Sequence, residues 1–579
     1  MQHGGVDTGD PQHVAGTHLT DYTLTPAPNS PPQTEQTAPR PVQPPVLRAL
    51  AFALLFATML AITLIRVRMA PTALERDEGE YAYAAQLALQ GTPPFVDVFN
   101  MKMPGIYWAY AVLIAVFGPT QTGIHLGFLA VNLLTILLAY RLVSLTLDPL
   151  SAALAASTYA WLSIGQGVFG AFAHATHFVI LFTLTGFLML APRGKTIGFV
   201  RPLLAGLALG TAFTMKQHAA PFILLGGACL LALLASDTTL SNAARLRRLA
   251  TFSAAVFTPF LIICLVVWRA GVFSTFWFWT FTYAQSYVSQ IPIASAPRNL
   301  LRGLYIVSYS TWSIWLLAIA GLAALRRRTL LSALVAGILL AGLVAITPGF
   351  IFREHYFVLL LPAIAMLATL GAREIASLAP RRLGARNRAL LTALLVVLAW
   401  GQAIYAQRAY LFTMPPFAIS RVLGGTQPFP ESVEIADYIA QHSTPGDRIA
   451  ILGSEPQIYF YANRRAASPY VYMYPLMENQ PNAALMQQDM IRGIESARPK
   501  FIVVVNHPSS WGMQQSSQQF VQRWYPAYLA AHYRPVGMFD LGLMVSEFYW
   551  EEEMTGHAHH AEYTVDVYQR LDSDAPQPH

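Results

Sequence analysis

Acidic residues follow the first long apolar segment of the chain, and a lysine follows further along the same loop. Residues 76–81 read Arg-Asp-Glu-Gly-Glu-Tyr, and residues 100–105 read Asn-Met-Lys-Met-Pro-Gly. A carboxylate can accept a proton from an attacking hydroxyl, and lysine is a compact positive charge that suits phosphate. The two segments therefore predict a site for proton transfer and phosphate binding at one face of a membrane.

The candidate catalytic carboxylates are Asp77 and Glu78, at the rim of the first apolar segment. The candidate phosphate-binding cations are Lys102, Arg298, Arg302 and Arg353. Other polar residues are expected at the same ends of the apolar segments, where they could line a shared cavity: Asp97, His174, His177, Lys216 and His355.

Two of these residues also have a structural explanation. Residues 82–90 have a helix-forming composition, so Asp77 with Glu80 could form a capping box at the start of that helix. Lys102 could extend its amine to the lipid headgroups, as lysines near helix ends often do. Both alternatives stay open on the sequence alone.

The composition indicates an integral membrane protein. Of the 579 residues, 54% are hydrophobic and only 12% are charged. A transmembrane helix needs about 20 mostly apolar residues, which predicts about eleven spans. They fall at 49–65, 123–140, twice in 149–190, twice in 202–236, and at 249–268, 303–325, 329–347, 356–372 and 389–406, with a further helix at the interface over 104–117.

The chain divides into four predicted parts. These are a disordered cytoplasmic tail (1–45), a transmembrane part (46–406) with its first external loop at 68–120, a linker (407–429) and an external α/β domain (430–579). Basic residues gather in alternate loops, for example Arg245, Arg247 and Arg248, which places the N-terminus inside and the C-terminal domain outside. The net charge of +7 follows from these loops and does not indicate nucleic-acid binding.

The C-terminal part alternates short helices and strands. Helices are expected at 431–442, 482–496 and 518–532, and strands at 448–452, 501–506 and 563–569. The loop 453–459 follows a strand, where α/β folds place ligand sites, but a polar cap on a helix start is the favoured explanation.

Metal binding is not predicted. His557, His559 and His560 lie near acids, but their spacing fits no closed zinc pattern, and a solvated loop is expected. His174 and His177 could share a helix face as ligands, or line a wet cavity. No cofactor is expected, and a divalent metal is not supported.

The first-loop residues carry a family resemblance. Residues 77–82 and 97–107, with 210–217 and 353–362, are similar to polyprenyl-phosphate-dependent membrane glycosyltransferases of the GT-C type, the group that contains protein O-mannosyltransferases and the aminoarabinose transferase of lipid A. The resemblance implies a polytopic, all-α membrane fold with a soluble α/β domain. It covers most of the part from about 49 to 406, and the first-loop pair is its most specific element.

The resemblance implies inverting transfer of one sugar from a polyprenyl-phosphate carrier to a glycolipid, protein or envelope polymer on the non-cytoplasmic face. Asp77 would then be the base, Lys102 would contact the lipid phosphate, and Arg353 with Tyr356 would help to hold the donor. The chain departs from the family at Met101, where many members carry an acid, and at 173–177, where many carry a second acid.

Three alternatives remain at this stage. An oligosaccharide ligase that uses a polyprenyl diphosphate would have similar topology. A transporter or flippase with an external solute-binding domain would place carboxylates near the bilayer midplane, where few of these spans have any. A non-catalytic scaffold has no positive support, but the missing second acid keeps it open.

Overall fold

The computed structural model describes residues 44–192, 197–327 and 329–571. The predicted tail 1–45 lies almost entirely outside these residues. Within them, six helices are long and apolar enough to cross a membrane, or seven if the bent pair α12–α13 counts as one span. The chain is therefore an integral membrane protein, although the predicted number of about eleven spans is not confirmed.

The apolar segments of the sequence all form helices, since only internal hydrogen bonding satisfies a backbone in lipid. The long helices are α1 (Pro45–Met69), α4 (Gln121–Ser144), α8 (Ala220–Ser236), α9 (Asn242–Arg269), α15 (Leu361–Ser377) and α16 (Gly384–Ala406). The shorter ones are α2 (Arg76–Leu89), α3 (Pro104–Phe117), α5 (Pro149–Ser163), α6 (Ala175–Leu190), α7 (Val200–Met215), α10 (Phe273–Trp277), α11 (Ala284–Val288), α12 (Ala296–Tyr309), α13 (Trp312–Gly321), α14 (Leu330–Ala345) and α17 (Pro416–Gly424).

Two predicted breaks are confirmed, and one straight span is not found. The segment 149–190 divides at the short helix η1 (Gln166–Val168), and 202–236 divides at Lys216. The predicted span 303–325 is instead bent by 111° between α12 and α13. Helix α13 still packs closely on α15, where a Cβ on Gly371 would lie 1.9 Å from the Leu317 carbonyl oxygen.

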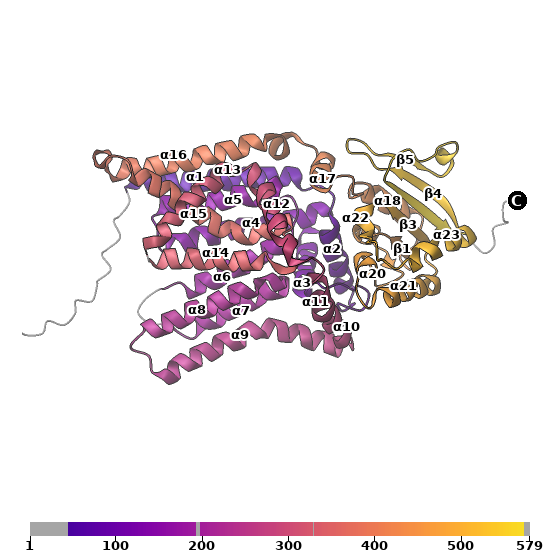
Figure 1. Ribbon diagram of the computed structural model, residues 1–579, viewed down its shortest axis with the longest axis horizontal. Helices are drawn as coiled ribbons and strands as arrows, with labels where there is room; N and C mark the ends of the chain where they lie inside the picture. Colours follow the sequence, from indigo (N-terminus) through magenta and orange to yellow (C-terminus); the bar gives the residue numbers. More distant parts are fainter. Residues whose placement is uncertain (1–43, 193–196, 328, 572–579) are drawn as a thin grey trace, which may run out of the picture. The chain divides into compact units, whose positions relative to one another are not determined.

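The helices of the membrane part lie alongside one another in Figure 1, where α1, α4 and α5 run next to α13, α15 and α16. Helices α6, α7, α8 and α9 pack against one another beside these helices. The loop between α1 and α4 holds α2 and α3, which pack on each other. This loop therefore brings the acids of residues 76–81 next to Lys102.

The C-terminal domain contains one mixed six-stranded sheet in the order β2-β1-β3-β6-β4-β5. The strands are β1 (Arg448–Leu452), β2 (Arg465–Ala466), β3 (Phe501–Asn506), β4 (Tyr533–Asp540), β5 (Glu547–Trp550) and β6 (Thr564–Arg570). Strands β2, β1 and β3 are parallel, and β6, β4 and β5 pair in antiparallel fashion. The helices are α18 (Glu431–Gln441), α19 (Gln457–Ala462), α20 (Tyr474–Met477), α21 (Ala483–Ala497), α22 (Pro508–Trp511) and α23 (Phe520–His532).

The C-terminal domain docks on α2 through the loop that follows β1. A Cβ on Gly79 would lie 2.6 Å from the backbone nitrogen of Gln457, so only glycine allows this approach. Arg76 donates hydrogen bonds to the Ser454 carbonyl (2.5 Å) and to Glu455 (3.0 Å). From Pro44 onward the two parts consequently form one compact unit.

Candidate functional site

The centre of the candidate site is an ion pair between α2 and the start of α3. The Lys102 ammonium lies 2.7 Å from Asp77 Oδ1, and the two side chains are 16% and 23% exposed. The capping box of α2 uses Glu75 and Glu78, so the predicted capping box of Asp77 and Glu80 is wrong. Asp77 is free of a capping role and points its carboxylate at the lysine.

The pair keeps both partners charged. Burial opposes ionisation of Asp77, but the charge of Lys102 outweighs it and holds the pKa of this carboxyl well below its usual range. Burial likewise opposes the charged form of Lys102, and Asp77 with Glu80 raises the lysine pKa above its usual value. At neutral pH the site therefore presents a carboxylate that can accept a proton next to a permanent cation.

Glu80 is a second acid close to Lys102. Its carboxylate is fully buried and accepts hydrogen bonds from Asn100 (2.8 Å) and from the Tyr107 hydroxyl (2.6 Å), with Lys102 3.7 Å away. Burial is the largest influence on Glu80 and raises its pKa to about 7. Residues on both sides of Lys102 thus fix the loop that carries it.

The second wall of the site comes from later elements. The Lys216 ammonium, in the turn between α7 and α8, lies 4.3 Å from the centre of the Tyr356 ring. Burial lowers the pKa of Lys216 to about 7, and the charge of Lys102 adds to this effect. Tyr356 belongs to η7 (Glu354–Leu360), and Arg353 directly precedes that element.

The C-terminal domain closes a third side, which the sequence did not predict. The Tyr472 hydroxyl lies 3.2 Å from Asp77 Oδ1 and 2.9 Å from the Arg76 carbonyl oxygen. Glu478 accepts a hydrogen bond of 2.5 Å from Tyr283 in η3 (Phe278–Tyr283). The one available signal was the run of alternating tyrosines in Tyr-Val-Tyr-Met-Tyr at 470–474.

These walls enclose a cavity of about 500 Å³. A volume of this size is typical of small-molecule sites. Its charged and polar lining includes Glu75, Arg76, Asp77, Asn100, Lys102, His174, Lys216, Gln217, His218, Arg353, Glu354, His355, Tyr356, Gln427, Tyr472, Tyr474 and Glu478. The predicted residues Asp77, Lys102, His174, Lys216, Arg353, His355 and Tyr356 are therefore brought together.

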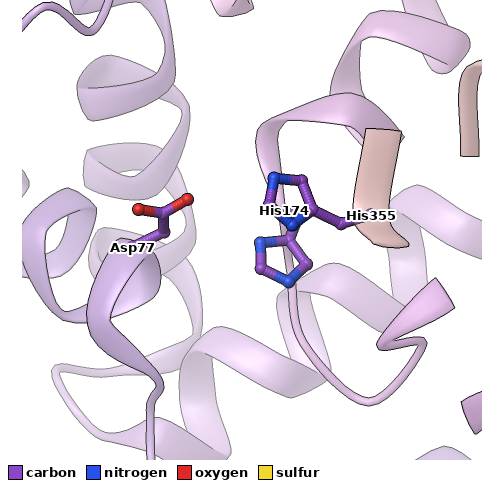
Figure 2. Close-up of side chains that lie close together, drawn as sticks. All are labelled: Asp77, His174 and His355. Carbon is purple, nitrogen blue, oxygen red and sulfur yellow. The ribbon is translucent and has the colours of Figure 1, made fainter. Parts of the chain in front are cut away.

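Two histidines face Asp77 across the cavity (Figure 2). His174 caps the start of α6 and His355 lies in η7. Their rings stack with centroids 4.2 Å apart and planes inclined by 17°. One ligand atom from each histidine and one Asp77 oxygen all lie within 4.8 Å of one another.

Other predicted residues lie elsewhere. Glu78 is fully buried, where it contacts His125 (3.0 Å) and accepts from the Ala173 backbone (2.6 Å), so its place is structural. Asp97 pairs with Arg465 of the C-terminal domain at 3.2 Å. His177 is buried against the Phe128 ring.

The phosphate-binding assignment of Arg298 and Arg302 is not supported by the geometry. Both are exposed on α12 and lie outside the lining of the cavity. Helix α12 is the first half of the bent pair. Sequence spacing could not predict that bend.

The loop 453–459 also differs from both expectations. Ser454, Glu455 and Gln457 are fully buried, and the loop holds α2 instead of a ligand or a helix cap. The loop 551–560 is fastened to the sheet, because His559 lies 2.7 Å from Asp540 and 2.9 Å from Asp566. The loop that was expected to be solvated is thus held against the sheet near its end, at His559.

Comparisons with known proteins find similar structures only at low identity. No family model and no curated protein matches the chain. The structure is similar to the archaeal oligosaccharyltransferase AglB from Archaeoglobus fulgidus, in complex with an inhibitory peptide and a dolichol-phosphate, with a TM-score of 0.48 and 12% identity over 87% of this chain and 74% of that one. It is also similar to ArnT from Cupriavidus metallidurans bound to undecaprenyl phosphate, with a TM-score of 0.49 and 16% identity over 92% and 99% of the two chains. At this level of likeness, the side chains of the cavity must decide the activity.

Proposed function

We propose that this membrane protein is a glycosyltransferase that moves one sugar from a polyprenyl-phosphate carrier to an acceptor hydroxyl or amine, with inversion. The observation that carries the proposal is the Asp77–Lys102 pair, 2.7 Å apart, on the wall of a cavity that also holds Lys216 and Arg353. The resemblance of the first-loop residues to such transferases supports the same reading.

Asp77 supplies the base. The acceptor oxygen or nitrogen forms a bond to the anomeric carbon, its proton passes to the Asp77 carboxylate, and the bond from that carbon to the phosphate oxygen breaks. When the donor phosphate shares the charge of Lys102, that charge no longer lowers the Asp77 pKa as strongly. The carboxylate then becomes a stronger base at the moment it is needed.

The cations receive the leaving group. Lys102, Lys216 and Arg353 border one cavity and can hold the phosphate from two sides as its charge grows in the transition state. Tyr356 lies beneath the Lys216 ammonium and limits where that cation can move. A single displacement with inversion requires one base on the face of the sugar opposite the leaving phosphate.

We place the reaction on the non-cytoplasmic face, because the arginine-rich loops predict that side for the C-terminal domain. That domain contributes Tyr472, Tyr474 and Glu478 to the cavity. The acceptor is a glycolipid, a protein or an envelope polymer that reaches the cavity from this side.

The test uses purified full-length protein, a polyprenyl-phosphate sugar and candidate acceptors, with mass spectrometry of the product. Asp77→Asn should abolish transfer, and Arg298→Ala should not, because Arg298 is exposed outside the cavity. Undiminished transfer by Asp77→Asn would rule out the base. A product that gains a whole repeat unit would instead identify a ligase, and counter-flow in proteoliposomes without a covalent product would identify a transporter.

A further inference from the structure

Asp77, His174 and His355 come from three separate segments that converge on one point (Figure 2). Asp77 lies in the first turn of α2, His174 precedes α6, and His355 lies in η7. Among the described residues they form a group whose possible ligand atoms all lie within 4.8 Å of one another. Such convergence in a cavity wall indicates a binding role for the group.

His174 provides a second, independent observation. Its side chain is 2% exposed, and neither ring nitrogen has a hydrogen-bond partner within the described protein. The nearest acid, Glu75, has its Oε1 atom 3.6 Å from Nδ1. A buried imidazole without partners is unfavourable, so its retention at the cavity wall calls for a ligand.

Asp77 can contribute an oxygen to such a ligand. Lys102 and the Tyr472 hydroxyl both contact Oδ1, which leaves Oδ2 for a third partner. Lys102, Lys216 and Arg353 disfavour a cation here, whereas Glu75 and Asp77 favour it, and all five line the same cavity. A phosphate group in the cavity would shift this balance further toward a cation.

We propose that Asp77, His174 and His355 bind one divalent transition-metal ion, for which Zn²⁺ is the probe. Two imidazoles and a carboxylate suit Zn²⁺ or Fe²⁺ better than Mg²⁺ or Ca²⁺, which prefer oxygen ligands. Ligands of a tetrahedral Zn²⁺ ion are about 3.4 Å apart, so a pair at the 4.8 Å limit must approach by about 1.4 Å through side-chain rotation. Three protein ligands leave a coordination position open toward the cavity.

The inference deepens the proposed function and rests on it for the role of the ion, though not for its binding. A bound ion would supply positive charge beside the leaving phosphate. The chain's own contribution is to hold two neutral imidazoles and one carboxylate at the wall that Lys102 and Lys216 share. One bound ion would thereby connect Asp77 of the first external loop with His355 of η7.

The test measures metal content in the full-length protein after chelator treatment and reloading with Zn²⁺. We expect about one ion per chain in the wild type and at least a roughly tenfold weaker affinity in His174→Asn and His355→Asn. His177→Asn is the matched control, because His177 is also buried with unpartnered ring nitrogens but lies outside the group. It should bind as the wild type does.

Cobalt substitution gives a readout that does not depend on activity. Co²⁺ in the wild type should show the absorption of a low-symmetry site with nitrogen ligands, and His355→Asn should weaken it. Absence of bound Zn²⁺ and Co²⁺ in the folded wild type would overturn the metal site and leave the proposed function standing. Stoichiometric binding without transfer from any lipid-linked sugar would uphold the site and remove the proposed function.

Discussion

Two neighbouring residues of α2 form ion pairs of opposite character. Arg76 pairs with Glu455 at 3.0 Å, with side chains 9% and 0% exposed, whereas Asp77 pairs with Lys102 at 2.7 Å beside the cavity. Arg76 also donates to Ser454 and Tyr474, and Glu455 also accepts from Ser510 (2.6 Å). Glu455 is fully buried outside the cavity lining, so the first pair has one partner closed off by protein, whereas both partners of the second pair line the cavity.

The difference separates structural from chemical use of charge. A buried pair with all its atoms satisfied mainly specifies one arrangement, here the docking of the C-terminal domain on α2. A pair that faces a cavity can exchange partners when a charged ligand enters. Removing charge from the first should therefore affect folding, and removing it from the second should affect reaction.

The largest expected effect is on reaction, in Asp77→Asn. Loss of the base should lower kcat by about 10²- to 10⁴-fold, since proton transfer contributes about this much. The thermal unfolding midpoint should change little, because the pair is partly exposed. Measured transfer rates and unfolding curves in detergent check both parts. A large drop in the unfolding midpoint would instead show that Asp77, like Arg76, has a structural role.

Glu455→Gln should show the reverse pattern. It leaves Arg76 buried without its counter-charge, which costs about 3–5 kcal/mol when one partner of a buried pair is removed. The domain contact should open, so protease should cleave the chain faster at the C-terminal domain. Unchanged proteolysis and an unchanged unfolding midpoint would contradict the structural role of this pair.

Gly79→Ala probes the same contact without changing charge. The added Cβ would lie 2.6 Å from the Gln457 backbone nitrogen, so α2 and the loop must separate. Overpacking of this kind costs about 1–3 kcal/mol. Thermal unfolding measures it, with Gly401→Ala in α16 as the control, because a Cβ there meets nothing within 4 Å.

Lys102→Ala should weaken donor binding by about 10- to 100-fold, the value of a charge-assisted hydrogen bond to phosphate. Arg302→Ala should change it less than about twofold, since exposed charges contribute little. Titration with a polyprenyl phosphate, followed by intrinsic fluorescence, compares the two variants. Equal effects would show that phosphate binding does not depend on the cavity.

The smallest expected effect is a pH dependence from Lys216. Because burial lowers its pKa to about 7, Lys216 is charged below that pH and loses its charge above it. Donor affinity should therefore fall a fewfold as the pH rises through about 7. Lys216→Arg keeps its charge and should flatten the profile; the same slope in this variant would assign the titration to another group.

The helices and most of the sheet followed from local patterns. Apolar length predicted the helical segments, and alternation with buried β-branched residues predicted β1, β3 and β6. Strand β4 was missed because Pro535 and Gly537 interrupt it, at a register shift in its pairing with β6. Strand β5 is short and lies at the sheet edge, where the hydrophobic pattern is weakest.

The site was predictable where its residues share one loop. Asp77 and Lys102 were identified because motif and composition place both beside the same apolar segment. Tyr472 and Glu478 were not, since they reach the cavity only through the docking of a distant domain. Arg298 and Arg302 lie outside the cavity lining, and their role stays a prediction; the 111° bend after α12 cannot be read from hydropathy.

The sequence alone determined that the chain is a membrane protein with an α/β domain and that an acid and a cation lie in one polar loop, because these properties depend on composition and near neighbours. Tertiary structure decided which of two adjacent charged residues closes a domain contact and which faces a cavity. That choice depends on what packs around each side chain, and residues 350–480 supply those partners from segments far along the chain.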